Sequence, residues 1–191
     1  MPFTHGMPGT RVTAGAVRGR ALKTPPGKGT RPTTALVREA LFNIIGESIR
    51  GATVLDLFAG AGTLGIEALS RGAARVTFVD LERACATIVS ENLGLTGFAQ
   101  HGDVFSVEAT QWLRTHKAAL SDYNLLLLDP PYRDERALTE TLRTLDGLPL
   151  RKEALIVVEH HRAQPLPTLA RLTEVRARDY GMTRLTFLRS P

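Results

Sequence analysis

The segment Asp129-Pro130-Pro131-Tyr132 combines a carboxylate, two prolines and an aromatic ring directly after four consecutive leucines. Consecutive prolines lack a backbone N–H and cannot extend a parallel strand, so they impose a rigid exit with free carbonyls. Asp129 and the Pro130 carbonyl are suited to accept the two N–H groups of an exocyclic amine on a flat base. Tyr132 is suited to stack on its ring. The segment therefore predicts a transfer to an amine, with much of the catalysis in positioning and with Asp129 favouring charge on the nitrogen.

A glycine-rich segment follows another apolar stretch, residues 54–58. Gly60, Gly62 and Gly65 match G-x-G-x-x-G, a pattern that also occurs in dinucleotide-binding folds. Asp56 precedes the first glycine by four residues, where a carboxylate would repel a pyrophosphate but would suit a cationic amino-acid head group. The fragment Asp-x-Phe-x-Gly-x-Gly resembles motif I of the S-adenosylmethionine (SAM) methyltransferases. A nicotinamide oxidoreductase and a turn needed only for packing are the alternatives.

Two further acids are expected at strand ends. Asp80 follows the stretch 75–79, and an acid there accepts ribose hydroxyls in nicotinamide enzymes and methyltransferases alike. Asp103 follows a weaker stretch, 99–101, where methyltransferases commonly place an acid against the adenine amino group, and the resemblance to motif I implies that role here. A surface acid and a turn cap are the respective alternatives. The predicted cofactor-binding residues are Asp56, Phe58, Ala59, Gly60, Gly62, Asp80, Leu81, Asp103 and Val104.

These residues require a scaffold that brings strand ends together. From residue 53 onward, the sequence alternates strand patterns with helix patterns. Strands are predicted at 54–58, 75–79, 99–101, 125–128, 154–158, 172–178 and 183–188. Helices are predicted at 63–71, 82–93, about 106–118 with Ser106 as cap, and 135–145. This alternation predicts a parallel sheet covered on both faces, with ligands beyond the carboxyl ends of the strands.

The first fifty residues hold the excess of positive charge. They contain eight Lys or Arg and two acids, whereas residues 51–191 are close to neutral and the net charge is +5. We expect a flexible start at 1–10 and a basic segment at 11–50. That segment would comprise a hairpin around Gly15, a Pro/Gly-rich loop and a helix that Thr33 or Thr34 caps and Gly46 ends. Arginine-rich charge suits phosphate, and a solvated face is the alternative.

Composition excludes several classes of protein. A chain of 191 residues with 43% hydrophobic and 23% charged residues suits one globular domain. The single cysteine, Cys85, cannot form an internal disulfide, which favours a reducing, cytoplasmic compartment. No apolar run approaches the ~18 residues of a membrane span. His160-His161 lacks partners at ligand spacing, so no metal is expected, and Glu159 is a weaker candidate for substrate contact.

Motifs along nearly the whole chain belong together. They are Arg11-Val12-Thr13-Ala14-Gly15, Arg18-Gly19-Arg20, Arg31-Pro32-Thr33, residues 37–43 (Val-Arg-Glu-Ala-Leu-Phe-Asn), residues 55–65 with 67–73, Asp129-Pro130-Pro131-Tyr132, and Tyr180-Gly181. With these motifs the chain resembles the RsmD family, bacterial 16S ribosomal RNA guanine-N2 methyltransferases. It departs from the family at Asp80, where Glu is more frequent, and at Ala14-Gly15, where Gly-Gly is more frequent. The shorter Asp80 side chain weakens the expectation that it contacts both ribose hydroxyls.

The resemblance implies an α/β fold of the class I SAM-dependent methyltransferases. This fold is Rossmann-like, with a mostly parallel sheet, an antiparallel last strand and a small N-terminal hairpin and helix. It also implies SAM as methyl donor, S-adenosylhomocysteine (SAH) as product, and N2 of guanine 966 as acceptor. The expected partner is 16S rRNA in the small subunit or its assembly intermediate, bound by a monomer. The expected RNA-binding residues are Arg11, Arg18, Arg20, Lys23, Lys28 and Arg31, and the expected catalytic residues are Asp129, Pro130, Pro131 and Tyr132.

Two rival functions stay open at this point. Adenine also presents an exocyclic amine, so a methyltransferase acting on adenine N6 in DNA or RNA would use the same Asp-Pro-Pro-Tyr segment. The absence of a separate target-recognition domain in so short a chain speaks against DNA. A non-catalytic RNA-binding assembly factor on a degenerate methyltransferase fold is the second rival. The intact motifs after two strands argue against it.

Overall fold

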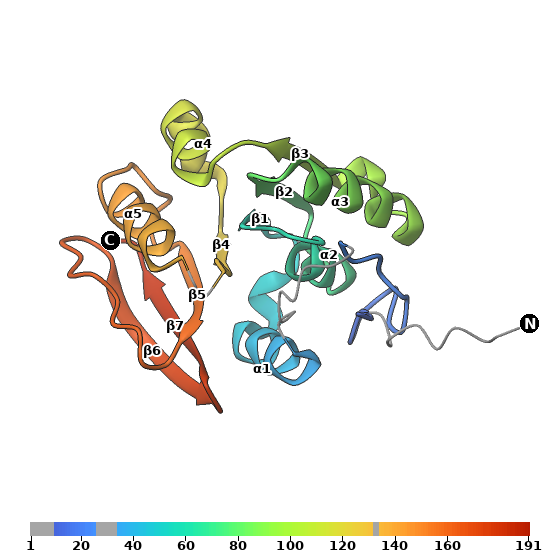
Figure 1. Ribbon diagram of the computed structural model, residues 1–191, viewed down its shortest axis with the longest axis horizontal. Coiled ribbons are helices and arrows are strands. Elements are labelled where there is room, and N and C mark those ends of the chain that lie inside the picture. Colours follow the sequence, from blue (N-terminus) through green and yellow to red (C-terminus); the bar gives the residue numbers. More distant parts are fainter. Residues whose placement is uncertain (1–9, 26–33, 132–133) are drawn as a thin grey trace, which may run out of the picture.

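The computed structural model describes residues 10–25, 34–131 and 134–191. Seven strands form one sheet in the order β3-β2-β1-β4-β5-β7-β6 (Figure 1). Their bounds are β1 Thr53–Leu57, β2 Arg75–Asp80, β3 Gly102–Ser106, β4 Leu125–Leu128, β5 Leu155–His161, β6 Thr173–Tyr180 and β7 Thr183–Arg189. β7 runs antiparallel to both of its neighbours, and the other pairs are parallel. The predicted mostly parallel sheet with an antiparallel last strand is confirmed.

Helices cover both faces of this sheet. They are α1 Ala35–Ile45, α2 Thr63–Ser70, α3 Arg83–Thr96, α4 Ala109–Thr115 and α5 Glu135–Asp146, with 3-10 turns η1 Gly46–Ile49, η2 Ala99–His101 and η3 Lys117–Asp122. One core packs α1, α2, α3 and part of the N-terminal segment against the sheet, and a second core packs α4 and α5 on the opposite face. No helix in the described part of the chain is long and apolar enough to cross a membrane.

The four leucines of β4 show why the central strand is apolar throughout. Leu125 and Leu127 belong to the first core, whereas Leu126 and Leu128 belong to the second. Side chains alternate between the faces of a strand, so a strand buried on both faces needs apolar residues at every position. Because β4 is the central strand, it places Asp129 in the middle of the row formed by the strand ends.

The N-terminal segment contains one antiparallel bridge, Arg11 with Ala21, in place of two predicted strands. Val12 and Gly19 still bond across this hairpin, with Gly19 N donating to the Val12 carbonyl at 2.9 Å, but its tip bonds to α2 instead: Ala16 N donates to the Ser70 carbonyl at 2.7 Å. The following helix, α1, begins as expected. Thr34 Oγ1 caps it by accepting from the N–H of its third residue at 3.3 Å.

Two predicted elements around β3 are wrong. Residues 99–101 form η2, and the strand starts only at Gly102. A Cβ on Gly102 would lie 2.6 Å from the Leu93 side chain, so the strand begins where a glycine lets it pass α3. Ser106 ends β3 and does not cap α4. The cap is Glu108, whose carboxylate accepts from the N–H groups of the first turn at 2.9 and 2.7 Å.

Candidate active site

The carboxyl ends of β1, β2 and β4 lie next to one another. β1 lies between the other two strands, and Leu57 is level with Val79 of β2 and Leu128 of β4. Asp129 directly follows β4, and Asp80 ends β2. Asp56 lies one residue before the end of β1. The sheet therefore brings three of the predicted carboxylates, Asp56, Asp80 and Asp129, together at the carboxyl ends of its strands.

The turn that leaves β1 has an unusual backbone. Phe58 has φ 64°, and Gly60 and Gly62 have φ 55° and 76°. A non-glycine residue in this region costs about 1–3 kcal/mol and persists where its surroundings enforce it. Here the N–H of Ala59 donates to the Val79 carbonyl at 3.0 Å, which holds the turn against β2. A Cβ on Gly60 would meet nothing nearer than 4.0 Å, so the outer side of the turn is open to a ligand.

Asp80 joins this turn to the end of β2. Its Oδ2 accepts from Gly60 N at 2.7 Å, and its Oδ1 accepts from Glu82 N at 2.8 Å. A carboxylate has about four lone-pair positions, so both oxygens keep capacity for hydroxyl donors. The side chain is half-buried, and the neighbouring Leu81 is 66% exposed. Asp80 is therefore oriented and accessible, as a ribose-binding acid must be.

Asp56 is the most perturbed acid of the site. It is 1% exposed, and its Oδ2 accepts from Gly65 N at 2.9 Å. Burial raises the pKa of Asp56 to about 8, and the charges of Asp129 and Asp80 add to this rise, although the Gly65 hydrogen bond opposes it. A buried carboxylate among other acids is stabilised by a cation. Its environment thus fits the ammonium of an amino-acid head group.

The prolines after β4 differ from each other. Pro130 is buried, and the structure records no hydrogen bond to its carbonyl within the described residues. The Pro131 carbonyl accepts from Asp134 N at 2.8 Å, so the prediction that both carbonyls are free is wrong for Pro131. The same residue caps α5, because the Asp134 carboxylate accepts from Ala137 N at 2.9 Å. Tyr132 lies outside the described residues.

Asp103 and Val104 do not join the other predicted residues. Asp103 is the second residue of β3, level with Thr77 in the body of the sheet, and forms an ion pair with Arg75 at 3.0 Å. Its predicted position after the third strand is wrong because that strand starts later. The acid that does follow β3 is Glu108. Partial burial raises its pKa, but hydrogen bonds from the first turn of α4 dominate and lower it.

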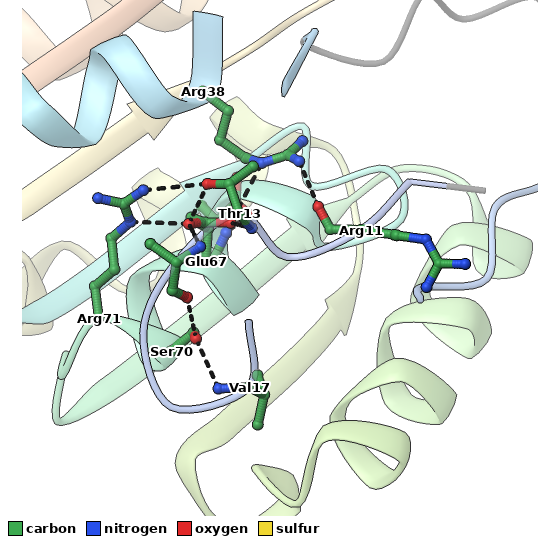
Figure 2. A network of polar contacts seen from close by, with 10 residues as sticks. Arg11, Thr13, Val17, Arg38, Glu67, Ser70 and Arg71 are labelled. Atoms are coloured by element: carbon green, nitrogen blue, oxygen red, sulfur yellow. Dashed lines mark hydrogen bonds and ion pairs between the residues drawn. The ribbon is translucent and has the colours of Figure 1, made fainter. Parts of the chain in front are cut away.

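Sequence reasoning also missed a buried anchor for the basic segment (Figure 2). Glu67 of α2 is fully buried, and its carboxylate accepts from Thr13 N, Thr13 Oγ1 and Ala14 N at 2.8, 2.6 and 3.0 Å. Arg38 and Arg71 pair with it at 3.4 and 2.8 Å. Burial lowers the pKa of Arg38, and the charge of Glu67 counteracts this effect. The sequence signal that could have revealed this anchor is an acid, Glu67, within the otherwise apolar stretch that forms α2.

The same helix holds the tip of the segment. Ser70 Oγ donates to the Ala14 carbonyl at 2.6 Å and accepts from Val17 N at 3.2 Å (Figure 2). Gly15 has φ 82°, and a Cβ there would lie 1.8 Å from the Ser70 carbonyl oxygen. Only glycine fits this contact. The segment is therefore fixed to the carboxyl end of the helix whose amino end follows the glycine turn.

A second missed residue links the segment to the glycine turn itself. Asn92 of α3 is fully buried, and its Oδ1 accepts from Lys23 N at 2.8 Å. Its Nδ2 donates to the carbonyls of Lys23 and Ala61 at 3.0 and 2.9 Å. Ala61 lies between the two glycines of the turn. The side-chain amide of Asn92 thus links the basic segment to the glycine turn of the candidate cofactor site.

The predicted RNA-binding residues separate into three groups. Arg18 and Arg20 are exposed, and so is Arg11, which donates to the Gly19 carbonyl at 2.9 Å. Lys23 forms an exposed ion pair with Glu91 at 3.0 Å. Lys28 and Arg31 lie outside the described residues. Within the described residues, no group of three His, Cys, Asp or Glu is arranged to hold a metal ion.

Comparison with known proteins agrees with this geometry. A relative in Bacillus subtilis (strain 168), "Putative rRNA methyltransferase YlbH", is 39% identical over 91% of this chain and 95% of its own length. "Ribosomal RNA small subunit methyltransferase D" of Escherichia coli (strain K12) is 40% identical over 88% and 83%, respectively. The solved structure of the putative methyltransferase yhhF from Escherichia coli is 35% identical and superposes with a TM-score of 0.82 over 94% of this chain and 97% of that one.

These structural matches identify the fold as that of the class I SAM-dependent methyltransferases. The family model described as "Conserved hypothetical protein 95" matches residues 10–189, which is nearly the whole chain. The protein therefore belongs to this family, the RsmD family.

Proposed function

We propose that the protein transfers the methyl group of SAM to N2 of guanine 966 in 16S rRNA. The observation that carries this proposal is Asp56, a buried acid beside the strained turn of Phe58 and in electrostatic range of Asp129. An amino-acid cation and an amine acceptor would meet at this edge of the sheet. The choice of substrate is supported by a relative named as an rRNA methyltransferase and by another named as a small-subunit rRNA methyltransferase.

The chain's residues would bind the cofactor at three points. Asp56 holds the ammonium of the amino-acid end, and the turn at Gly60 and Gly62 lets the backbone approach it. Asp80, oriented by Gly60 N, accepts from the ribose. Bound SAM supplies a methyl group activated on a sulfonium. No residue in this set requires a metal.

The exit of β4 would hold the acceptor. Asp129 and the Pro130 carbonyl accept the two N–H groups of the guanine amine, which directs its lone pair toward the methyl group. Formation of the N–C bond would be matched by cleavage of the S–C bond, with SAH as the leaving group, and the positively charged nitrogen would then lose one proton to solvent. The negative Asp129 stabilises that charge. The rigid prolines fix the position of the carbonyl, and we propose that Tyr132 stacks on the base.

The basic segment would supply attraction for RNA, since Arg11, Arg18 and Arg20 are exposed on a segment whose backbone is anchored to α2. A base in structured RNA must be presented or flipped to reach the edge of the sheet. The proposed substrate is the small subunit or its assembly intermediate in the cytoplasm, and the proposed enzyme acts as a monomer.

Transfer of tritiated methyl groups to small subunits that lack this modification tests the proposal. Nucleoside mass spectrometry of the product should show N2-methylguanosine, and mapping should place it at guanine 966. Appearance of N6-methyladenosine would instead establish the adenine alternative. A protein that binds subunits but neither binds SAM in calorimetry nor transfers methyl groups would be a non-catalytic assembly factor.

A further inference from the structure

The edge strand β6 carries positive charge that the sequence pattern did not reveal. β6 is the last strand in the sheet order and pairs only with β7. Four of its eight residues are basic or acidic, and most of the strand is exposed. An exposed edge strand with charged residues resists pairing with another chain. These charges are divided between the two faces of the strand by sign.

The register assigns the charges to faces. Arg176 is opposite Phe187 and Arg178 is opposite Leu185, and both partners belong to the core that includes α1. Directly paired residues point to the same side of an antiparallel pair. Tyr180 follows with the same alternation and packs partly against this core. We call Arg176, Arg178 and Tyr180 the β6 stripe.

Acids lie on the other face. Asp179 forms a two-point pair with Arg184, with distances of 2.6 and 2.9 Å. Glu174 is opposite Leu188, which belongs to the second core. In the described part of the chain, Arg176 has no ion pair, and Arg178 donates only to the backbone carbonyl of Ala177 at 2.9 Å. The β6 stripe therefore presents two arginines for which the described residues show no ion pair.

The position of the stripe matches the candidate active site. β6 runs parallel to β5 and β4, because each of the antiparallel pairs with β7 reverses the direction once. Tyr180, at the carboxyl end of β6, therefore lies on the same side of the sheet as Asp129, which follows the carboxyl end of β4. The stripe also shares its face with the basic N-terminal segment, whose Val12 and Leu22 belong to the same core. In Figure 1, α1 lies between this segment and the β6–β7 hairpin.

We propose that the β6 stripe is a second RNA-binding surface, at which Arg176 and Arg178 contact phosphates and Tyr180 lies against the ribose or base at the edge. This inference rests on the proposed function. RNA would contact the basic segment on one side of α1 and the β6 stripe on the other, and the two contacts would orient the acceptor base toward Asp129. Charge complementarity selects RNA as the occupant, because phosphates are dense along its backbone.

The magnitude follows from counterion release. Each phosphate contact contributes about 0.7–0.9 to the slope of log affinity against log salt concentration. Such a contact is worth about five- to eightfold in affinity at 0.1 M salt relative to 1 M salt. Arg176→Gln and Arg178→Gln should each weaken RNA binding by that factor at 0.1 M salt, and the double variant by about 25- to 60-fold. Affinity for SAM should not change.

The test measures equilibrium binding to a 16S rRNA fragment and to the small subunit across a salt titration. Arg143→Gln is the matched control, because Arg143 is an exposed arginine of α5 on the opposite face of the sheet. The control should keep the wild-type slope, and the double variant should lose about 1.5 from it. If the double variant shows the wild-type slope of log affinity against log salt concentration, the inference is wrong.

Other occupants give different results. If the double variant binds the subunit more weakly but binds the protein-free fragment normally, the stripe contacts a ribosomal protein and the inference is wrong. If sedimentation shows a wild-type dimer that the double variant abolishes, the surface is an interface between copies. Binding is measured without methyl transfer, so an inactive wild-type protein that keeps the arginine dependence refutes the proposed function alone.

Discussion

The affinity for SAM should rise with pH between 6 and 7 because Asp56 must lose its proton to hold a cation. Burial raises the pKa of Asp56 to about 8, so about 1% of the cofactor-free protein carries the ionised form at pH 6 and about 9% at pH 7. The ammonium of the ligand, with a pKa of about 7.8, stays mostly charged over this range. The product of the two ionised fractions increases about eightfold.

Calorimetry with SAH in buffers of different ionisation enthalpy measures both the affinity and the proton balance. At pH 7, binding should release about 0.8 proton, the protonated share of Asp56 less the small uptake by the ligand amine. Asp56→Asn keeps an acceptor for Gly65 N but cannot ionise, so its weaker binding should not vary with pH in this range. An affinity that is constant between pH 6 and 7, without proton release, refutes the assignment of Asp56.

The same shift affects stability in the cofactor-free protein. The folded pKa of Asp56 lies above its unfolded value, so the folded state holds the proton more tightly and stability falls as pH rises from about 4 to about 8. At about 1.4 kcal/mol per pKa unit, the scale of this cost is roughly 6 kcal/mol. Asp56→Asn should therefore raise the melting temperature more at pH 8 than at pH 5.

Four further substitutions, of which Glu91→Gln is a control, test the site and its anchors. Asn92→Ala leaves buried backbone groups unpaired, so it should cost about 2–4 kcal/mol in chemical unfolding and weaken both SAM and RNA binding. Glu91→Gln, which removes only the exposed ion pair next to it, should change stability by less than about 1 kcal/mol. Gly15→Ala forces a Cβ against Ser70 and should lower the melting temperature by about 6–12 °C, equivalent to about 3 kcal/mol. Asp129→Ala should reduce kcat about 100- to 1000-fold without weakening SAM binding, since the Asp129 charge raises the pKa of Asp56. Full activity in Asp129→Ala would refute its role.

Local patterns predicted much of the fold because local physics determines it. The leucines of β4 required burial on both faces, and Thr34 marked the start of α1 through its capping hydroxyl. The G-x-G-x-x-G segment and Asp56 likewise identified a strand–turn–helix unit from adjacent residues alone. The strand at 99–101 was wrong because its beginning depends on the packing of Gly102 against α3, which the local sequence does not show.

The anchors could not be found in this way. Glu67 and Asn92 bind partners on segments far from them in the chain, and a buried polar residue in a helix does not reveal which backbone it will satisfy. The error at Asp103 had a similar origin. A shift of a few residues in the start of β3 moved that acid into the body of the sheet and left Glu108 at the edge.

The anchoring of the basic segment determines when it becomes able to act. Its backbone binds Glu67 and Asn92, which follow it in the chain by 53 to 69 residues. During synthesis the segment leaves the ribosome before α2 and α3, but it cannot dock until these helices have been made and have closed that long loop. A nascent or truncated chain would carry the arginines without their arrangement. Ordered presentation of positive charge is thus delayed until the candidate cofactor site has folded.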